Sequence, residues 1–513
     1  MKSRTAKQRG LGTAVAAIAL TALLLVTACA PSLTTSPAST PTPTPTPTST
    51  SAPTPPSPDA SAEEQIVYFI VKTTYEDLPP EVIEWAKKAI MDTLAVTIAG
   101  SSQEAIPEVV DLVKGWGGAE ESTILVHGGK VPAPNAAFAN GPQARALDMG
   151  DVHEEGGHSG EYILPALLAA AELRAQRGQP VTGKELITAY VVGGEILARV
   201  GNFCQAISRP TGNPIFGWCG GTAAVAKVLN LNQEQTWNAL GISYVTYSGW
   251  DMQMYLEGAL MCRVHHAQAC QDEVTNVLLA EKGITGPKEI FMPFIFQHYP
   301  RNVSVEGYDS LTEGLGTTWE FAEGTMVKPY QCCKIHHPWI SAVISCIEEN
   351  DIDPASIEKI ALRVANVGNP SNFFEPYRYD PQTFVDCQFS APWTVATAAF
   401  DGYVFLDSYE DIYREEVRAL MPNVVATIDE TLTGWSAIAT ITVDGEEYTK
   451  QVDYVLGHPQ NPVDWEWLTD KLNGCAAYSA VPIPEANLTK LMAKVQGLEN
   501  VADVGEIISL VTP

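Results

Sequence analysis

Residues 146–158 read ALDMGDVHEEGGH and place four carboxylates and two imidazoles among three glycines. Asp148 and Asp151 are three residues apart, and His158 follows Asp148 by ten. The glycines allow the backbone to bend, so that His158 can approach the carboxylates. A carboxylate beside an imidazole sets its tautomer and raises its basicity, which suits general acid–base catalysis. The same residues also fit a helix cap followed by a solvated acidic turn, so their types alone leave both interpretations open.

Helical patterns surround this segment. In PPEVIEWAKKAIMDTLAVTIAGS (79–101), apolar side chains fall at 82, 83, 86, 90, 94 and 98, the spacing of one buried helix face. Pro79 and Pro80 favour a helix start, and Gly100 favours a helix end. Ala-rich helical patterns then run through 164–230, and few strand signals precede residue 320. The sequence therefore predicts a helical domain over 62–323.

Strand patterns begin after residue 324. The stretch KIALRVANV alternates at Ile360, Leu362 and Val364, as a half-buried strand does. Two alternating runs flank Asp444-Gly445, a strong hairpin signal. We therefore expect a mostly α chain, in which a smaller α+β domain (324–458) is inserted into an all-α domain. Helices over 459–513 return to that helical domain.

The first 61 residues have a different character. A basic start, MKSRTAKQRG, precedes an apolar run from Leu11 to Val26, and this layout is typical of a secretory signal. The stretch LVTAC (25–29) resembles a bacterial lipobox, which predicts a signal peptide over 1–28 and lipidation at Cys29. Residues 29–61 are rich in Pro and Thr, as a disordered tether is. These features predict an extracytoplasmic protein held at the cell membrane by a lipid anchor.

Net charge and cysteine spacing exclude several classes of function. The net charge is −29, and removal of the four basic residues of the signal peptide makes it −33. Nucleic-acid binding needs a basic face, so we expect no nucleic-acid partner. An anionic substrate must instead meet a local cluster of cations. None of the ten cysteines forms a C-x-x-C pair, so we expect no zinc site.

Several ordered motifs resemble the MmgE/PrpD family, which includes 2-methylcitrate dehydratases and cis-aconitate decarboxylases. The segment NGPQARALDMGDVHEEGGHSGEYILPALLAAAEL resembles the family signature, with Asp148, Asp151, His158 and Pro165 at matching positions. Four further stretches match in order: LMCRVHHAQACQDEVTNVLLAEKGITGP, MVKPYQCCKIHH, QFSAPWTVATAAFDG and GHPQNP. The resemblance extends over about residues 62–513.

The resemblance implies an all-α domain that carries an α+β lid, and acid–base chemistry on small polycarboxylates without a metal or organic cofactor. It assigns the acid–base steps to Asp148 and His158, with Asp151 beside them. It also implies a homodimer through the helical domain. The residues that it suggests for substrate binding, in a pocket between helical domain and lid, are Lys328, Arg263, His265 and either Tyr377 or Tyr379; His336 and His337 are weaker candidates.

The departures from the family pattern bear on the substrate. Cys262 stands where the resemblance implies a lysine, and a neutral thiol cannot clamp a carboxylate as an ammonium does. Gly150 replaces the middle acid, Arg145 replaces a histidine, and Arg209 is a new cation near a lost histidine. These changes argue against 2-methylcitrate or cis-aconitate. The loss of an ammonium at Cys262 favours a ligand with one carboxylate fewer, or with a neutral group there. Cys262 itself is either a small buried residue or a thiol activated by nearby positive charge.

Two classes of function remain open. The first is a lyase of dehydratase type, with isomerisation, epimerisation or decarboxylation as alternatives, acting on a small carboxylated molecule. The second is a tethered protein that has lost catalysis and uses the same pocket to bind a ligand. Asp148, His158 and Lys328 occur together, which favours the enzyme.

Overall fold

Two large hydrophobic cores organise the part of the chain that the computed structural model describes, which comprises residues 54–57, 59–208, 215–246, 253–291, 305–432, 434 and 436–513. These residues belong to one unit, 52–513. The predicted signal peptide, Cys29, most of the predicted tether and Arg209 lie outside the described residues. Within those residues, no helix is both long enough and apolar enough to span a membrane.

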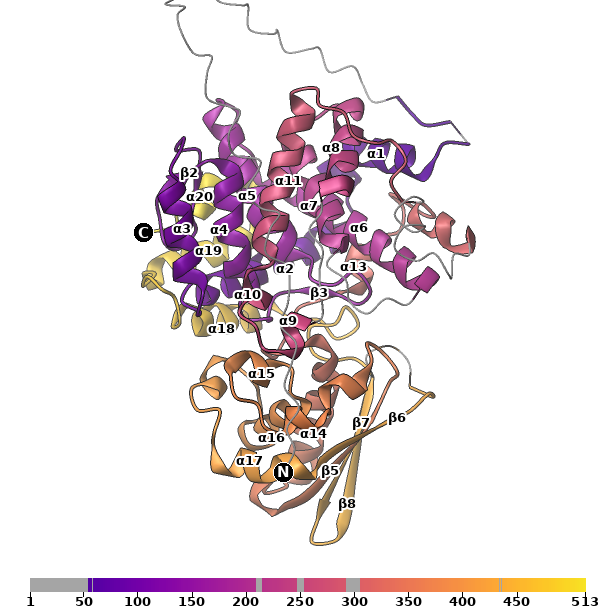
Figure 1. Ribbon diagram of the computed structural model, residues 1–513, viewed down its shortest axis with the longest axis vertical. Coiled ribbons are helices and arrows are strands. Elements are labelled where there is room, and N and C mark those ends of the chain that lie inside the picture. The colour runs from indigo at the N-terminus through magenta and orange to yellow at the C-terminus, as the bar shows by residue number, and fades with distance from the viewer. Residues whose placement is uncertain are drawn as a thin grey trace, which may run out of the picture. The chain divides into compact units, whose positions relative to one another are not determined.

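The first core is built by helices (Figure 1). They are α1 (Ala62–Lys72), α2 (Pro80–Gly100), α3 (Ile106–Trp116), α4 (Ala133–Arg145), α5 (Gly160–Gln176), α6 (Gly183–Ser208), α7 (Ile215–Val228), α8 (Gln233–Thr246) and α11 (His266–Glu281). Helix α2 has the predicted bounds, but its burial exceeds the predicted single face, because every residue from Ala89 to Gly100 is buried whereas Ile83 is only partly buried. Gly100 is required by a close approach, because a Cβ there would lie 1.9 Å from the carbonyl oxygen of Gln143 on α4.

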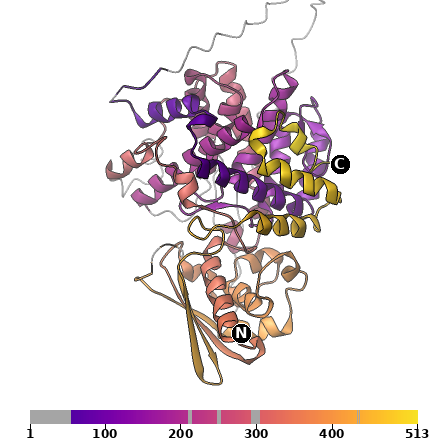
Figure 2. The same ribbon diagram turned by 180° about the vertical axis from the view of Figure 1, so that it is seen from behind.

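The end of the chain returns to this first core. Helices α18 (Trp465–Ala476), α19 (Glu485–Gln496) and α20 (Gly505–Ile508) contribute Leu472, Leu491 and Ile507 to it. Helices α18 and α19 pack against α2, and from behind these yellow helices lie beside the indigo-to-violet α2 (Figure 2). The first and last helices of the described chain therefore share one core.

The second core lies around a four-stranded sheet. The strand order is β6-β5-β7-β8, with β5 and β6 parallel and the other pairs antiparallel. The strands are β5 (Ile357–Val364), β6 (Val424–Ile428), β7 (Ala437–Val443) and β8 (Glu446–Val452). Asp444 (φ 50°) and Gly445 (φ 77°) both adopt the left-handed conformation that a tight hairpin turn requires. The predicted mostly α chain with a smaller α+β part is confirmed.

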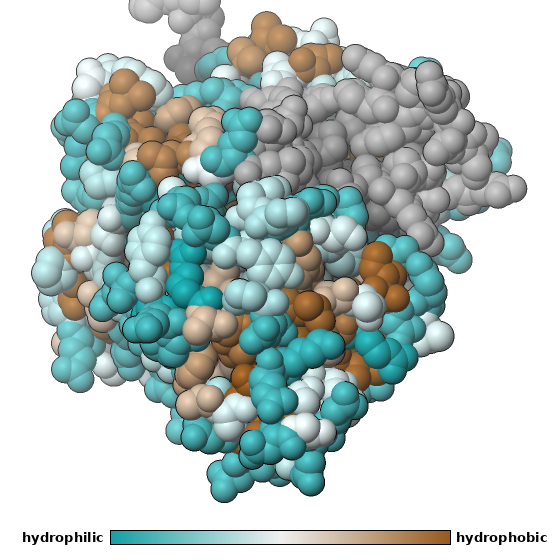
Figure 3. All heavy atoms as spheres, turned by 60° about the horizontal axis from the view of Figure 1, so that its bottom comes forward, coloured by the Kyte–Doolittle hydropathy of each residue, from teal (hydrophilic) through white to brown (hydrophobic). Residues whose placement is uncertain are grey.

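Helices cover one face of this sheet. Helix α14 (His337–Asn350) packs against β7 and β8, and α16 (Ala391–Asp401) packs against α14. Along β5, Ile360, Leu362 and Val364 are buried, as their alternation predicted. Figure 3 views this part from the end at the bottom of Figure 1, and hydrophilic side chains cover most of that surface between smaller hydrophobic groups. The sheet-bearing part therefore buries its apolar side chains beneath a mainly polar surface.

Candidate active site

A short antiparallel strand pair brings distant parts of the sequence together. In it, β3 (Val152–His153) pairs with β4 (Thr325–Met326), and Val152 lies opposite Met326. Lys328 follows β4 by two residues, and its Nζ donates to the backbone oxygen of Asp148 (2.7 Å), to Asp148 Oδ1 (2.7 Å) and to the backbone oxygen of Cys332 (3.2 Å). The pairing thus joins two residues that are 180 positions apart.

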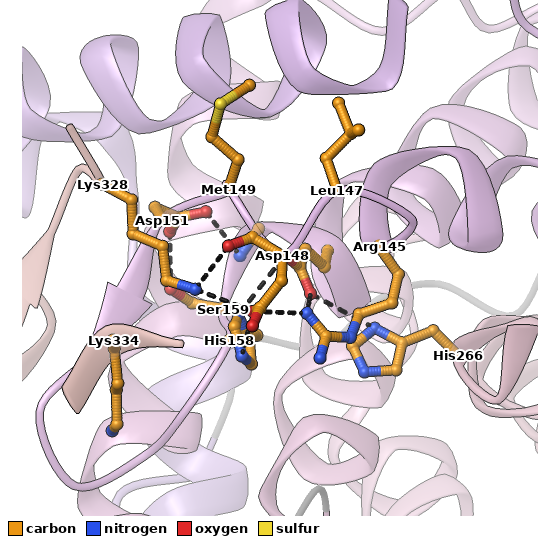
Figure 4. Close-up of polar contacts among 12 residues, drawn as sticks. Arg145, Leu147, Asp148, Met149, Asp151, His158, Ser159, His266, Lys328 and Lys334 are labelled. Atoms are coloured by element: carbon orange, nitrogen blue, oxygen red, sulfur yellow. Dashed lines mark hydrogen bonds and ion pairs between the residues drawn. The ribbon is translucent and has the colours of Figure 1, made fainter. Parts of the chain in front are cut away.

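Asp148 lies in the loop after α4, in the left-handed conformation (φ 50°) that Asp tolerates better than most residues. Its Oδ1 also accepts a 2.7 Å bond from Nη1 of Arg145, the last residue of α4 (Figure 4). Burial by itself would raise the pKa of Asp148, but Lys328 and Arg145 hold it well below its usual value. A carboxylate paired with two cations is a weak base, so its main effect is to hold the two cations side by side.

His158 lies between two carboxyl groups. Its Nε2 is 3.4 Å from Asp148 Oδ1, and its Nδ1 is 3.3 Å from Glu161 Oε1. Burial, together with Arg145 and Lys328, lowers the pKa of His158 well below its usual value. The imidazole is therefore neutral near neutral pH, with one N–H and one free lone pair. Its side chain is 20% exposed, against 5% for Asp148, so His158 is the more accessible of the two.

Glu161 was not among the residues selected from the sequence. It lies in the first turn of α5 and is fully buried. Its Oε2 is 3.5 Å from Arg145 Nη1 and 3.6 Å from Nδ1 of His266, which stacks on Tyr162 with ring centroids 3.8 Å apart. Burial raises the pKa of Glu161 to about 8, against the influence of Arg145 and Lys328. A lone acid before the apolar run YILPALLAAA was the available sequence signal.

Asp151 has a different environment from Asp148. Its carboxylate accepts bonds from Ser159 Oγ (2.6 Å), the Gly160 amide (3.0 Å) and Thr93 Oγ1 (3.2 Å). Burial raises its pKa to about 7. Two of these neutral donors lie at the start of α5, so Asp151 holds the N-terminus of that helix and is paired with no cation in the part of the chain that the structure describes.

The segment that begins with α10 (Met261–Val264) does not supply the expected cations. Arg263 is buried, its Nη1 donates to the carbonyl of Glu104 (3.3 Å), and its guanidinium lies 4.7 Å from the ring centroid of Phe384. His265 Nδ1 contacts the carbonyl of Cys262 (3.0 Å), and its Nε2 is 3.4 Å from the Tyr255 hydroxyl. That hydroxyl accepts a 3.4 Å bond from Arg145 Nη2, and the His265 ring lies 4.2 Å from that of His266, so His265 approaches the cluster through Tyr255 and His266.

Cys262 is buried among apolar residues of the second core, and its thiol is free. Burial raises the thiol pKa to about 11, although Arg145 and Arg263 lower it. A protonated thiol at neutral pH favours the small buried residue over the activated thiol. Arg145 and Asp148 are close enough to act on the thiol electrostatically, so position 262 borders the cluster.

The remaining candidates from the predicted lid contact other side chains or backbone carbonyls rather than the Asp148–His158 pair. Tyr377 is 46% exposed and lies against Arg378, whereas the Tyr379 hydroxyl donates to the carbonyl of Val424. His336 Nδ1 contacts Thr394 Oγ1 (3.1 Å). Burial, together with the nearby Arg378, lowers the pKa of His336 to about 3. His337 Nε2 is 3.4 Å from the Cys332 carbonyl, which also accepts from Lys328.

Three consecutive carbonyls of the loop after α4 are each held by a side chain from the second half of the chain. Gln388 Nε2 donates to Leu147 (2.6 Å), Lys328 to Asp148, and Lys471 Nζ to Met149 (3.0 Å). Lys471 also bonds the Lys328 carbonyl (2.9 Å) and pairs with Asp92 (2.5 Å). Irregular buried backbone needs such partners. In the sequence, the only signal of this support was Asp92, the single charged residue in the apolar stretch AIMDTLAV.

The assembled cluster consists of Arg145, Asp148, His158, Glu161 and Lys328. It offers two cations beside one ionised carboxylate, and a neutral imidazole that contacts a second, proton-bearing carboxyl. Such a site can hold an anion and move one proton next to it. In the described part of the chain, no group of three or more His, Cys, Asp or Glu side chains is arranged to hold a metal ion.

Comparison with known proteins identifies the family. The MmgE/PrpD N-terminal domain matches residues 64–293, and the MmgE/PrpD C-terminal domain matches residues 330–496. The cis-aconitate decarboxylase-like protein oryM of Aspergillus oryzae is 26% identical over 88% of this chain and 98% of its own length. Cis-aconitate decarboxylases of Aspergillus terreus (22%; 87% and 95% covered) and Mus musculus (23%; 82% and 87% covered) are also similar. The chain belongs to the MmgE/PrpD family, whose members act on small carboxylates.

Proposed function

We propose that this chain is a lyase that decarboxylates a small unsaturated di- or tricarboxylate at the Arg145–Lys328 cluster. The observation that carries the proposal is the neutral His158, which lies beside two buried cations that share a single carboxylate. This pair leaves one positive charge for a substrate anion. Relatives that are named cis-aconitate decarboxylases favour loss of CO₂ over loss of water.

In this scheme Arg145 is the main carboxylate ligand. Lys328 already uses its three N–H donors on Asp148 and Cys332, whereas Nε of Arg145 has no partner among the described residues. A guanidinium also presents its donors in the planar arrangement that matches a carboxylate. Lys328 then acts by fixing Asp148 and by adding positive charge. His158 protonates the carbon from which CO₂ departs.

A panel of carboxylates tests the proposal. Purified mature protein is incubated with cis-aconitate and with unsaturated dicarboxylates, and CO₂ release and product NMR are followed. Turnover that is lost in His158→Gln supports the lyase. A thermal shift without turnover on any member of the panel supports the binding-protein alternative. Cys262 in place of a lysine favours a substrate with fewer carboxylates than cis-aconitate, so faster turnover of a dicarboxylate is the expected result.

Dehydration is the second candidate. It needs one group to remove a proton next to a carboxylate and another to protonate the leaving hydroxyl. The neutral imidazole of His158 and the proton-bearing carboxyl of Glu161 supply both within one cluster. Formation of an alkene from a hydroxy acid in the same panel, without CO₂, would identify this reaction.

We propose further that the protein is exported and lipid-anchored, on the strength of the sequence around Cys29. Cys29→Ser should leave the precursor uncut or release soluble protein, and fractionation with mass measurement distinguishes these from normal anchoring. Normal processing and membrane retention of this variant would exclude the anchor. A homodimer through the helical part stays an expectation from the family, and light scattering of the purified protein tests it.

A further inference from the structure

Glu161 is the buried acid of the cluster that the decarboxylation scheme leaves without a role. It is fully buried, and neither carboxyl oxygen has a hydrogen bond of normal geometry among the described residues. The Gly150 amide and the Arg145 guanidinium lower the pKa of this carboxyl, but burial outweighs both and favours the protonated form. His158 Nδ1 lies 3.3 Å from Oε1, and within the described part of the chain this nitrogen has no hydrogen bond of normal geometry either.

The backbone leaves a defined space for this carboxyl. A Cβ on Gly150 would lie 3.0 Å from Glu161 Oε1 and 3.2 Å from its Cγ, so a side chain there would press on the carboxyl. The glycine at 150 and the glutamate at 161 therefore fit each other. Burial in this space holds the carboxyl against the His158 ring rather than in solvent.

The charges that face Glu161 come from every surrounding element. Arg145 on α4, Asp148 in the loop, His158 before α5, His266 on α11 and Lys328 after β4 all act on it or contact it, as do Asp92, Asp151 and Cys270. Two cations balanced by Asp148 alone leave one positive charge. Ionisation of Glu161 would cancel that charge, so an anionic substrate favours protonated Glu161.

We infer that Glu161 is a positioning residue that stores the proton delivered to the substrate through His158. The inference rests on the proposed function, because the substrate must receive a proton. In the free protein, ionised Asp148 can only accept, which assigns the imidazole N–H to Nε2. The bare Nδ1 then accepts from the hydroxyl of Glu161.

The step balances as follows. The C–C bond to the leaving carboxylate breaks and releases CO₂, and its electron pair stays on the substrate carbon framework. That carbon takes the proton from His158 Nε2, while His158 Nδ1 takes the proton from Glu161. The imidazole stays neutral throughout, and Glu161 becomes a carboxylate. One proton from solvent restores Glu161 when the product leaves.

Glu161→Gln tests this inference, with Glu273→Gln as the matched control. Glu273 on α11 is likewise buried and has no hydrogen-bond partner for either oxygen among the described residues, but it lies outside the cluster. Infrared spectra recorded from about pH 6 to 10 should show a carboxylic-acid band in the wild type that disappears near pH 8. This band should be absent from Glu161→Gln and retained in Glu273→Gln. An ionised Glu161 at neutral pH would overturn the inference, whether or not any substrate is found.

The pH profile provides the second readout. Wild-type kcat/KM, which reports the free enzyme, should fall as the pH rises through about 8, because the stored proton is lost. Glu161→Gln should lower kcat about 100-fold, change KM little, and remove this falling limb. If Glu161→Gln lost activity equally at every pH and still showed the fall at high pH, the role of Glu161 would be structural and the inference would be overturned. Failure of every carboxylate to turn over would instead refute the proposed function.

Proton uptake provides a test that does not depend on the variant's activity. Tricarballylate, a saturated tricarboxylate, serves as an unreactive probe. Calorimetry near pH 8 in two buffers of different ionisation enthalpy should show wild-type protein taking up a fraction of a proton on binding. Equal uptake by Glu161→Gln would contradict Glu161 as the acceptor. Loss of uptake in that variant alone supports it.

Discussion

The Asp148 cluster and the α10 segment both carry buried cations, and the structure uses them differently. In the cluster, Arg145 and Lys328 come from separate elements and meet on one carboxylate oxygen. On α10, Arg263 turns to a backbone carbonyl and an aromatic ring. Of these cations, Arg145 meets Asp148 from the end of α4, and the β3–β4 pair brings Lys328 to the same carboxylate. Proximity in the sequence to a histidine motif therefore does not identify a substrate ligand.

Lys328→Met should have the largest effect. It leaves Asp148 paired with Arg145 and removes support from the loop carbonyls, so kcat/KM should fall at least about 1,000-fold. Removal of one partner from a buried ion pair should also lower the free energy of unfolding by about 3 kcal/mol. Steady-state kinetics and urea unfolding measure the two effects. Arg263→Met is the matched control, and equal losses in both variants would break the comparison between the segments.

Cys262→Lys should mainly destabilise the protein. An ammonium at this buried position would face Arg145 without a carboxylate of its own, at a cost of about 3 kcal/mol. Urea unfolding of Cys262→Lys beside Cys262→Ala separates the charge from the loss of the thiol. The opposite result, normal stability with a gain of activity on tricarboxylates, would mean that Arg145 does not replace the missing lysine.

Arg145→Lys keeps the positive charge but loses the planar set of donors. If Arg145 binds the substrate carboxylate, KM should rise about tenfold while kcat changes less. Kinetics with the best carboxylate of the panel measure this. Arg199→Lys alters a buried arginine paired with Glu195 on α6 and should leave KM unchanged. An unchanged KM in Arg145→Lys would indicate that Lys328, rather than Arg145, is the main ligand of the substrate carboxylate.

Asp151→Asn should change kcat/KM less than about threefold, because an amide oxygen still caps α5. Burial raises the pKa of Asp151 from 3.8 to about 7, so the folded state keeps a proton that the unfolded state has lost. Wild-type stability relative to Asp151→Asn should therefore decline as the pH rises from 3.8 through about 7. Urea unfolding across that range measures it. A large loss of activity at unchanged stability would instead make Asp151 an acid–base group.

Arg263→Gln should have the smallest effect, a change in kcat/KM of less than about threefold. Its guanidinium makes no contact with Asp148, His158 or Lys328 among the contacts within the described residues. Stacking on Phe384 is partly kept by the glutamine side chain. A loss above about 100-fold, the range of a direct electrostatic contact to reacting groups, would show that Arg263 does reach the substrate.

The sequence by itself determined the elements. Periodic apolar side chains specify α2 and β5, and Asp444-Gly445 specifies the hairpin, because these signals depend on local geometry alone. The resemblance to the family motifs selected Asp148, His158 and Lys328 as candidates, and the structure places these three within one cluster.

Only the tertiary structure decided the roles of the charged side chains. Asp148 and Asp151 look alike in the sequence, yet one meets two cations and the other meets a hydroxyl and an amide at a helix start. Arg145, Glu161 and Lys471 gain their importance from partners up to 379 residues away. Ionisation depends on burial and on opposing charges in space, and neither quantity is a property of the local sequence.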